Sequence, residues 1–257
     1  MSFFNSLLDW VGRRIANRIQ RPVSGYEPFT PSDRETLERV LQPCDILLIE
    51  GNQKVSSAIK YLTQSTWSHA ALFIGTTKTD HPVHREPAQL IEANLGEGVV
   101  AVPLSKYERF NTRICRPVGL TPQDREAIIQ FAVERIGQQY DTRHIFDLMR
   151  YLLPTPPVPV RWRRRMIALG SGDPSRVICS TLIAQAFHHV RYPILPLVSS
   201  PDDPVPRVRS AYSRREILHI RHHSLFAPRD FDVSPFFAIV KPTLETGFDY
   251  KDLTWGG

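Results

Sequence analysis

Apolar residues along this chain follow two spacings, one typical of strands and the other of helices. Short apolar runs bounded by turn residues predict strands at residues 44–50, 65–75, 89–94, 98–104, 112–118 and 236–240. Val55, Ile59 and Leu62 recur at helical spacing, which predicts a helix over residues 54–64. Because several strands are combined with a few helices, we expect an α+β fold.

Capping residues mark two more helices. Ser32 begins a capping-box pattern that predicts a short helix over residues 32–41. Thr121 is a good N-cap, and Pro122 stands at the first helical position behind it. Gly137 can end this second helix. Its expected apolar face consists of Ala127, Ile128, Phe131, Ala132 and Ile136.

The chain contains no internal repeat and no flexible Gly/Ser linker, so we expect residues 31–257 to form one domain. Proline-rich segments at residues 154–160 and 193–206 are predicted to be loops of this domain. Residues 1–30 are predicted to form a separate amphipathic helix and a linker.

The expected amino-terminal helix has one apolar face and one basic face. A helix of this kind can lie on an anionic membrane, and it can equally pack on the protein's own core or on a partner subunit. Residues 1–21 do not have the order of a signal peptide, since the arginines follow the apolar residues. The apolar face consists of Phe4, Leu7, Leu8, Val11, Ile15 and Ile19, and the arginines are Arg13, Arg14, Arg18 and Arg21.

The net charge of +6 is compatible with an anionic partner such as a phospholipid surface. The basic cluster at residues 161–165 is accompanied by no recognised nucleic-acid-binding motif, so we do not expect nucleic acid as a partner. Three cysteines without a close pair indicate neither a zinc ribbon nor a disulfide framework, which favours the reducing cytoplasm. The adjacent histidines at 188–189 and 222–223 lack metal-ligand spacing, and we expect no metal and no cofactor.

Two residues are candidates for chemistry. His69 stands at the start of an otherwise apolar strand, where a structural histidine is the simpler interpretation. Cys179 begins a helical pattern over residues 179–190 and shares its apolar stripe with Leu182 and Ala186. In the first turn of a helix, free N–H groups and the helix dipole favour a thiolate, although a cysteine also fills cores as a small apolar residue.

The order of these motifs resembles the permuted papain-like cysteine hydrolases, which are relatives of the NlpC-type amidases. The segments "CDILLIEG", "STWSHAALFIG", "LIEANLGEGVVAVPL" and "VICSTLIAQAF" place the histidine first, a polar residue on the next strand second, and the cysteine at a helix start last. The resemblance extends over about residues 40–190. Cys44 departs from it, because such families usually have glycine before the aspartate of the first strand.

The resemblance implies a circularly permuted papain-like fold, in which an antiparallel sheet packs against the helix that carries Cys179. Cys179 would be the nucleophile, His69 the acid and base, and Glu92 the residue that orients His69. Tyr140 matches a tyrosine that lines the site in such enzymes, and Ser68, beside His69, is an auxiliary candidate. Whether His69 and Glu92 meet depends on the register of the two strands, which the sequence does not determine.

The resulting hypothesis is a cysteine hydrolase that cleaves an amide, ester or thioester bond through an acyl-enzyme. We expect the protein in the cytoplasm, where it can bind peripherally to the inner face of the membrane, and a lipid or lipidated substrate fits this location. A small molecule or a peptide is a further candidate substrate. A cell-wall peptide amidase or endopeptidase is the first alternative function. The second alternative is a papain-like fold that serves as an inactive basic binding module.

Overall fold

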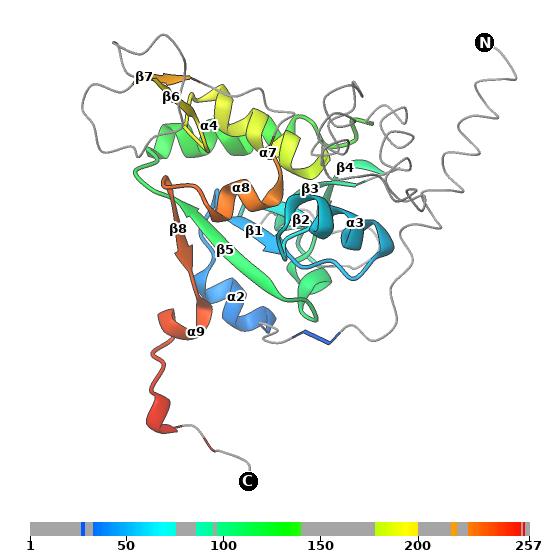
Figure 1. The fold of residues 1–257 in the computed structure, drawn as a ribbon, viewed down its shortest axis with the longest axis vertical. Coiled ribbons are helices and arrows are strands. Elements are labelled where there is room, and N and C mark those ends of the chain that lie inside the picture. The colour runs from blue at the N-terminus through cyan, green and yellow to red at the C-terminus, as the bar shows by residue number, and fades with distance from the viewer. Residues whose placement is uncertain are drawn as a thin grey trace, which may run out of the picture.

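In the computed structural model of the chain, helices pack around one main β-sheet (Figure 1). The expectations for residues 1–26, Tyr140 and the segment 154–165 lie outside the part of the chain that is described. The structure describes residues 27–28, 33–75, 86–94, 97–139, 178–199, 217–219, 226–252 and 254.

The main sheet has six strands in the order β4-β3-β2-β1-β5-β8, and every neighbouring pair is antiparallel. A separate pair, β6 and β7, forms a small second sheet. The α+β fold class is therefore confirmed. The strands are β1 Ile46–Ile49, β2 His69–Phe73, β3 Leu90–Asn94, β4 Gly98–Val102, β5 Thr112–Pro117, β6 Leu197–Ser199, β7 Ile217–His219 and β8 Phe237–Val240.

Helices cover both faces of the main sheet (Figure 1). Helices α4 and α7 contribute Ile128, Leu182 and Ile183 to the core on one face, together with Ile46 and Leu72 of the sheet. Helix α2 and the turn η1 cover the other face. The helical elements are α2 Arg34–Val40, α3 Lys54–Thr63, η1 Leu104–Tyr107, α4 Pro122–Val133, α7 Ile178–His189, α8 Pro228–Asp232, α9 Pro242–Glu245 and η3 Tyr250–Asp252.

Of the two N-cap residues predicted from the sequence, one is the N-cap in the structure, and the other is replaced by the next residue along the chain. Thr121 caps α4 as predicted, since its side chain accepts a hydrogen bond from the Asp124 N–H group. Helix α2 is capped by Asp33, which accepts from the Thr36 N–H group, so the prediction of Ser32 as the N-cap was wrong. Serine and aspartate side chains can both accept a hydrogen bond from an N–H group in the first turn of a helix. The sequence spacing alone therefore did not distinguish Ser32 from Asp33 as the N-cap.

Two further expectations require correction. Helix α4 ends at Val133, four residues before Gly137, and Ile136 is therefore 43% exposed instead of lying on the buried face. Residues 197–199, which were assigned to a proline-rich loop, form strand β6 because they pair with residues 217–219. The pairing partner lies 20 residues away in sequence, so the local proline content did not reveal it.

Cys44 lies in a turn before β1, not in the strand, and it has a positive φ of 74°. A left-handed backbone is the conformation that glycine adopts without steric cost, so the glycine expected from the resemblance would fit this position without strain. The Cys44 side chain is fully buried, and its thiol donates to the Arg125 carbonyl group at 3.3 Å. Burial raises the pKa of the Cys44 thiol to about 12.

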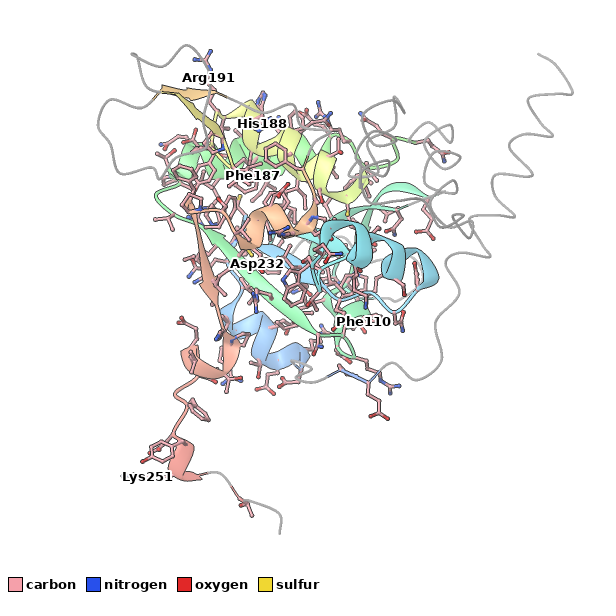
Figure 2. The ribbon with its side chains drawn as sticks, viewed as in Figure 1. Phe110, Phe187, His188, Arg191, Asp232 and Lys251 are labelled. Carbon is pink, nitrogen blue, oxygen red and sulfur yellow. The ribbon has the colours of Figure 1, made fainter. Side chains whose placement is uncertain are left out.

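Helix α8 is attached to the sheet through Asp232, its last residue (Figure 2). Asp232 accepts a hydrogen bond from the Trp67 indole N–H group at 2.9 Å and binds the Arg113 guanidinium group through both oxygens. The Arg113 guanidinium group also lies 4.9 Å from the centre of the Trp67 ring. These contacts connect α8 with the residues just before β2 and with β5.

The segment that follows α4 continues along the β4 edge of the sheet. The Gly137 N–H group donates to the Val99 carbonyl group at 2.8 Å, and the Val99 N–H group donates to the Gln138 carbonyl group at 2.9 Å. Gly98 has a φ of +79°, and a Cβ atom there would collide with the Gln138 carbonyl oxygen. Glycine is therefore required at position 98 for the backbone conformation and for the close approach of this segment.

We expect Gly98→Ala to destabilise the protein more than Gly119→Ala. Both glycines have a positive φ, but a Cβ atom at Gly119 meets nothing within 4 Å. Gly119→Ala should cost about 1–2 kcal/mol of unfolding free energy, the usual cost of a left-handed non-glycine residue. Gly98→Ala should cost about 1–3 kcal/mol more because of the collision. Denaturant unfolding measures both values, and equal losses would show that the contact with Gln138 is unimportant.

Candidate active site

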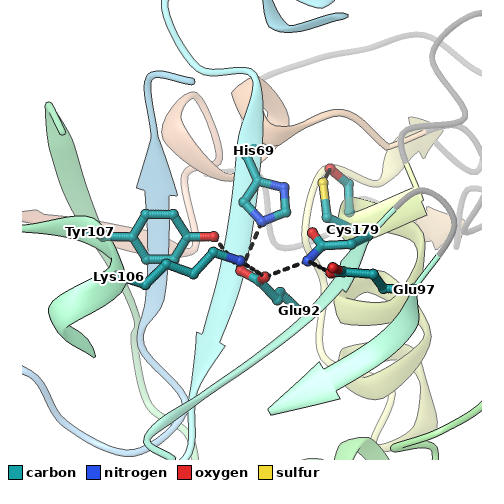
Figure 3. Close-up of polar contacts among 8 residues, drawn as sticks. His69, Glu92, Glu97, Lys106, Tyr107 and Cys179 are labelled. Atoms are coloured by element: carbon teal, nitrogen blue, oxygen red, sulfur yellow. Dashed lines mark hydrogen bonds and ion pairs between the residues drawn. The ribbon is translucent and has the colours of Figure 1, made fainter. Parts of the chain in front are cut away.

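His69 is the first residue of β2, and its side chain is 20% exposed. It stands at the end of the strand, where a side chain can contact elements that cover both faces of the sheet. Its ring lies 6.1 Å from the Tyr107 ring of η1, measured between centroids, and the Cys179 side chain of α7 lies beside its imidazole (Figure 3). His69 therefore connects the two sides of the sheet.

Glu92 lies in the middle of β3 and has no exposure to solvent. The Oε2 atom of Glu92 is 3.0 Å from His69 Nε2 (Figure 3). Strands β2 and β3 pair antiparallel with Leu72 opposite Ile91 and Phe73 opposite Leu90, and this is the register that the sequence left open. The structure thus brings together His69, the predicted acid and base, and Glu92, the residue predicted to orient it.

Cys179 is the second residue of α7, within the first turn of that helix, and it is 2% exposed. Leu182, Ile183 and Ala186 of the same stripe are buried, as the helical spacing predicted. Figure 3 shows the sulfur atom beside the imidazole ring, on a different side from Glu92. Because His69 Nε2 contacts Glu92, the other ring nitrogen, Nδ1, remains for the thiol.

Opposing effects determine the pKa of His69. Burial by itself lowers the pKa of an imidazole, since it disfavours the charged form. The negative charges and hydrogen bonds of Cys179 and Glu92 outweigh burial and raise the pKa of His69 from 6.5 to about 10. The raised pKa favours the imidazolium form of His69, which Cys179 and Glu92 flank.

Lys106 and Tyr107 complete the surroundings of Glu92, and sequence reasoning missed both. The Tyr107 hydroxyl group donates to Glu92 Oε2, and the Lys106 ammonium group binds Oε1. Asn94 donates a further hydrogen bond to Oε1 at 2.7 Å. Burial raises the pKa of the Glu92 carboxyl group, but His69 and Lys106 outweigh burial and hold it well below its usual range.

A glutamate inside an apolar strand such as "LIEAN" is the signal that could have indicated these partners, because a buried carboxylate requires donors or a cation. The sequence does not show which residues supply them. Lys106 and Tyr107 lie in η1, which begins at Leu104, the last residue of the strand expected over residues 98–104. Strand β4 ends at Val102, and the turn that follows carries both side chains back to Glu92.

The remaining candidates have different environments. The Ser68 hydroxyl group is buried and accepts a hydrogen bond from the Gly51 N–H group at 2.9 Å, so its described contact is with the turn after β1. Its role towards a substrate stays a prediction, as does that of Tyr140. In the described part of the chain, no three His, Cys, Asp or Glu side chains are arranged to hold a metal ion.

We expect Glu92→Gln to reduce stability most between about pH 4.5 and 6.5. The pKa of Glu92 is lowered from 4.5, so its contribution is present above that pH and is lost as the pH falls. The pKa of His69 is raised from 6.5 to about 10, so its contribution is complete below pH 6.5 and declines as the pH rises to about 10.

The loss at pH 6 should be roughly 3 kcal/mol, because one member of a buried ion pair is removed. Urea unfolding at pH 6 and pH 10 measures the change, which should be smaller at pH 10. Glu97→Gln is the matched control, because Glu97 is exposed and accepts from the same Asn94 side chain at 2.9 Å. A loss that is equal at both pH values would contradict the assignment of the ion pair.

Comparison with known proteins supports the assignment of the fold family. A comparison with curated proteins gives no match. The crystal structure of the metalloprotein yiiX from Escherichia coli O157:H7 is similar, with 15% sequence identity, coverage of 78% of this chain and 96% of that chain, and a TM-score of 0.44. Residues 40–151, which include His69 and Glu92 and end before Cys179, match the family described as permuted papain-like amidase enzymes, YaeF/YiiX, C92 family. The resemblance is therefore confirmed: over residues 40–151, this chain is similar to the permuted papain-like amidases.

Proposed function

We propose that the protein is a cysteine-dependent hydrolase that cleaves an amide, ester or thioester bond through an acyl-enzyme on Cys179. The position of His69 between Glu92 and Cys179 carries this proposal, because it combines a nucleophile, an acid–base group and an orienting carboxylate. The family match at residues 40–151 supports amide chemistry in particular.

In the first step, the Cys179 thiolate attacks the carbonyl carbon of the substrate. A carbon–sulfur bond forms, and the carbonyl electrons move to oxygen to give a tetrahedral oxyanion. Backbone N–H groups in the first turn of α7 have no partner within the helix, so the Cys179 N–H group is a suitable donor to that oxyanion. The oxyanion then collapses, and the bond to the leaving group breaks while the His69 imidazolium protonates the leaving group.

In the second step, neutral His69 removes a proton from water, and the resulting hydroxide attacks the acyl carbon. The carbon–sulfur bond breaks, the carboxylic acid is released, and the thiolate–imidazolium pair is restored. Glu92 keeps the proton on Nε2 throughout and thereby directs Nδ1 towards the reacting atoms. The proton is thus transferred at a single nitrogen of His69 in both steps.

Two substrate classes remain as proposals. A lipid or lipidated substrate is favoured by the basic amphipathic pattern of residues 1–21. A cell-wall peptide is the alternative suggested by the relationship to NlpC-type amidases. In the described part of the chain, no helix has the length and apolar character needed to cross a membrane.

The decisive experiment for the proposed function is the alkylation of the native protein by iodoacetamide at pH 6, followed by mass spectrometry. Cys179 should react on the order of tenfold faster than in the denatured protein, because its thiolate is paired with His69. Cys44 and Cys115 are internal controls, since both are fully buried and burial raises the pKa of both thiols. Neither should react in the native protein.

His69→Ala should abolish the fast reaction of Cys179, whereas His189→Ala should leave it unchanged. His189 is the matched control because it lies on the same helix and is exposed. If native Cys179 reacts no faster than in the denatured protein, the hydrolase proposal fails. Salt-dependent binding to nucleic acid or an acidic protein would then favour the basic binding module.

The membrane proposal has its own test, which is vesicle flotation of the full chain and of a variant without residues 1–21. The full chain should bind vesicles of phosphatidylcholine and phosphatidylserine but not vesicles of phosphatidylcholine alone. Deletion should abolish binding, and Arg14→Gln with Arg18→Gln should weaken it, since surface attraction depends on charge. Equal binding by the deletion variant would remove the argument for a lipid substrate.

A further inference from the structure

Two cationic groups bind the buried carboxylate of Glu92. The His69 imidazole contacts Oε2 from strand β2, and the Lys106 ammonium group contacts Oε1 from the turn η1. Glu92 has no exposure, whereas the Lys106 side chain is 33% exposed. The site therefore contains an additional charge that the triad of nucleophile, acid–base group and orienting carboxylate does not require.

The groups that face His69 come from three elements. Strand β3 supplies Glu92, helix α7 supplies Cys179, and η1 supplies the neutral hydroxyl group of Tyr107. Glu97 is connected to the cluster only through the Asn94 amide, which donates to both glutamates. Lys106 is therefore the only described cation besides His69 that contacts Glu92.

A catalytic histidine must hold its proton until the leaving group needs it and must then release it. A buried carboxylate without another cation would retain the imidazolium proton strongly, because its charge is poorly screened. A second cation on the same carboxylate takes up part of that charge. This effect makes the imidazolium a stronger acid and still keeps it oriented.

We propose that Lys106 is a positioning residue that shares the Glu92 carboxylate with His69 and thereby limits how firmly His69 holds its proton. The inference rests on the proposed function, since it assigns Lys106 a role in the same acid–base step. It differs from a purely structural role of Lys106, which would affect folding stability and leave the proton affinity of His69 unchanged.

The test is an NMR titration of the full chain with labelled histidine, in which the Cε1–H resonance of His69 is assigned with a His69→Gln variant. Lys106→Met should move the titration of His69 to higher pH by about one unit, because a cation close to the imidazolium is removed. Lys106→Arg should restore a titration close to that of the wild type, since the charge returns. Lys106→Gln provides a second neutral variant if Lys106→Met folds poorly.

Lys60→Met is the matched control. Lys60 binds Glu50 at 3.0 Å in a partly buried ion pair, and this pair involves none of the residues around His69. It should reduce stability slightly and leave the titration of His69 unchanged.

The outcomes separate this inference from the proposed function. If His69 in the wild type titrates near 6.5, the ion pair with Cys179 and the hydrolase proposal both lose their basis. If His69 titrates high in the wild type but Lys106→Met causes no shift, or a shift to lower pH, only the role of Lys106 is overturned.

Discussion

The Glu92 carboxylate imposes the strongest physical constraint on this structure, because it is charged and fully removed from water. Transfer of such a group into the interior costs several kcal/mol unless donors and cations surround it. The donors are His69 of β2, Asn94 of β3, and the neighbouring residues Lys106 and Tyr107 of η1. The path of the chain after β4 is therefore required by the same carboxylate that orients the histidine.

This constraint joins folding and chemistry in one cluster. The apolar residues of β1 and β2 fill the cores on both faces of the sheet and hold His69 at the end of its strand. Helix α7 packs on one of those faces and brings Cys179 to the imidazole from the side opposite to Tyr107 and Lys106 (Figure 3). The sheet thus fixes His69 and Glu92, and a packed helix places the proposed nucleophile, Cys179, beside them.

Much of the fold could be predicted from local patterns, because apolar spacing and capping residues act over a few positions. The strand that carries His69, the helix begun at Thr121 and the position of Cys179 in a first turn all follow from such patterns. The pairing register of β2 and β3 and the partners of Glu92 depend on contacts between distant residues, so they could not be predicted. For the same reason residues 197–199 were not predicted as a strand.

The order of the site along the chain has a consequence for synthesis. His69, Glu92 and Lys106 are all made before Cys179, and domains assemble as their segments emerge. Asp232, which binds Trp67 and Arg113, is made later still. A growing polypeptide therefore carries His69 and Glu92 before Cys179 has been made. The proposed pairing of the Cys179 thiol with His69 can form only after the segment that makes α7 has been translated.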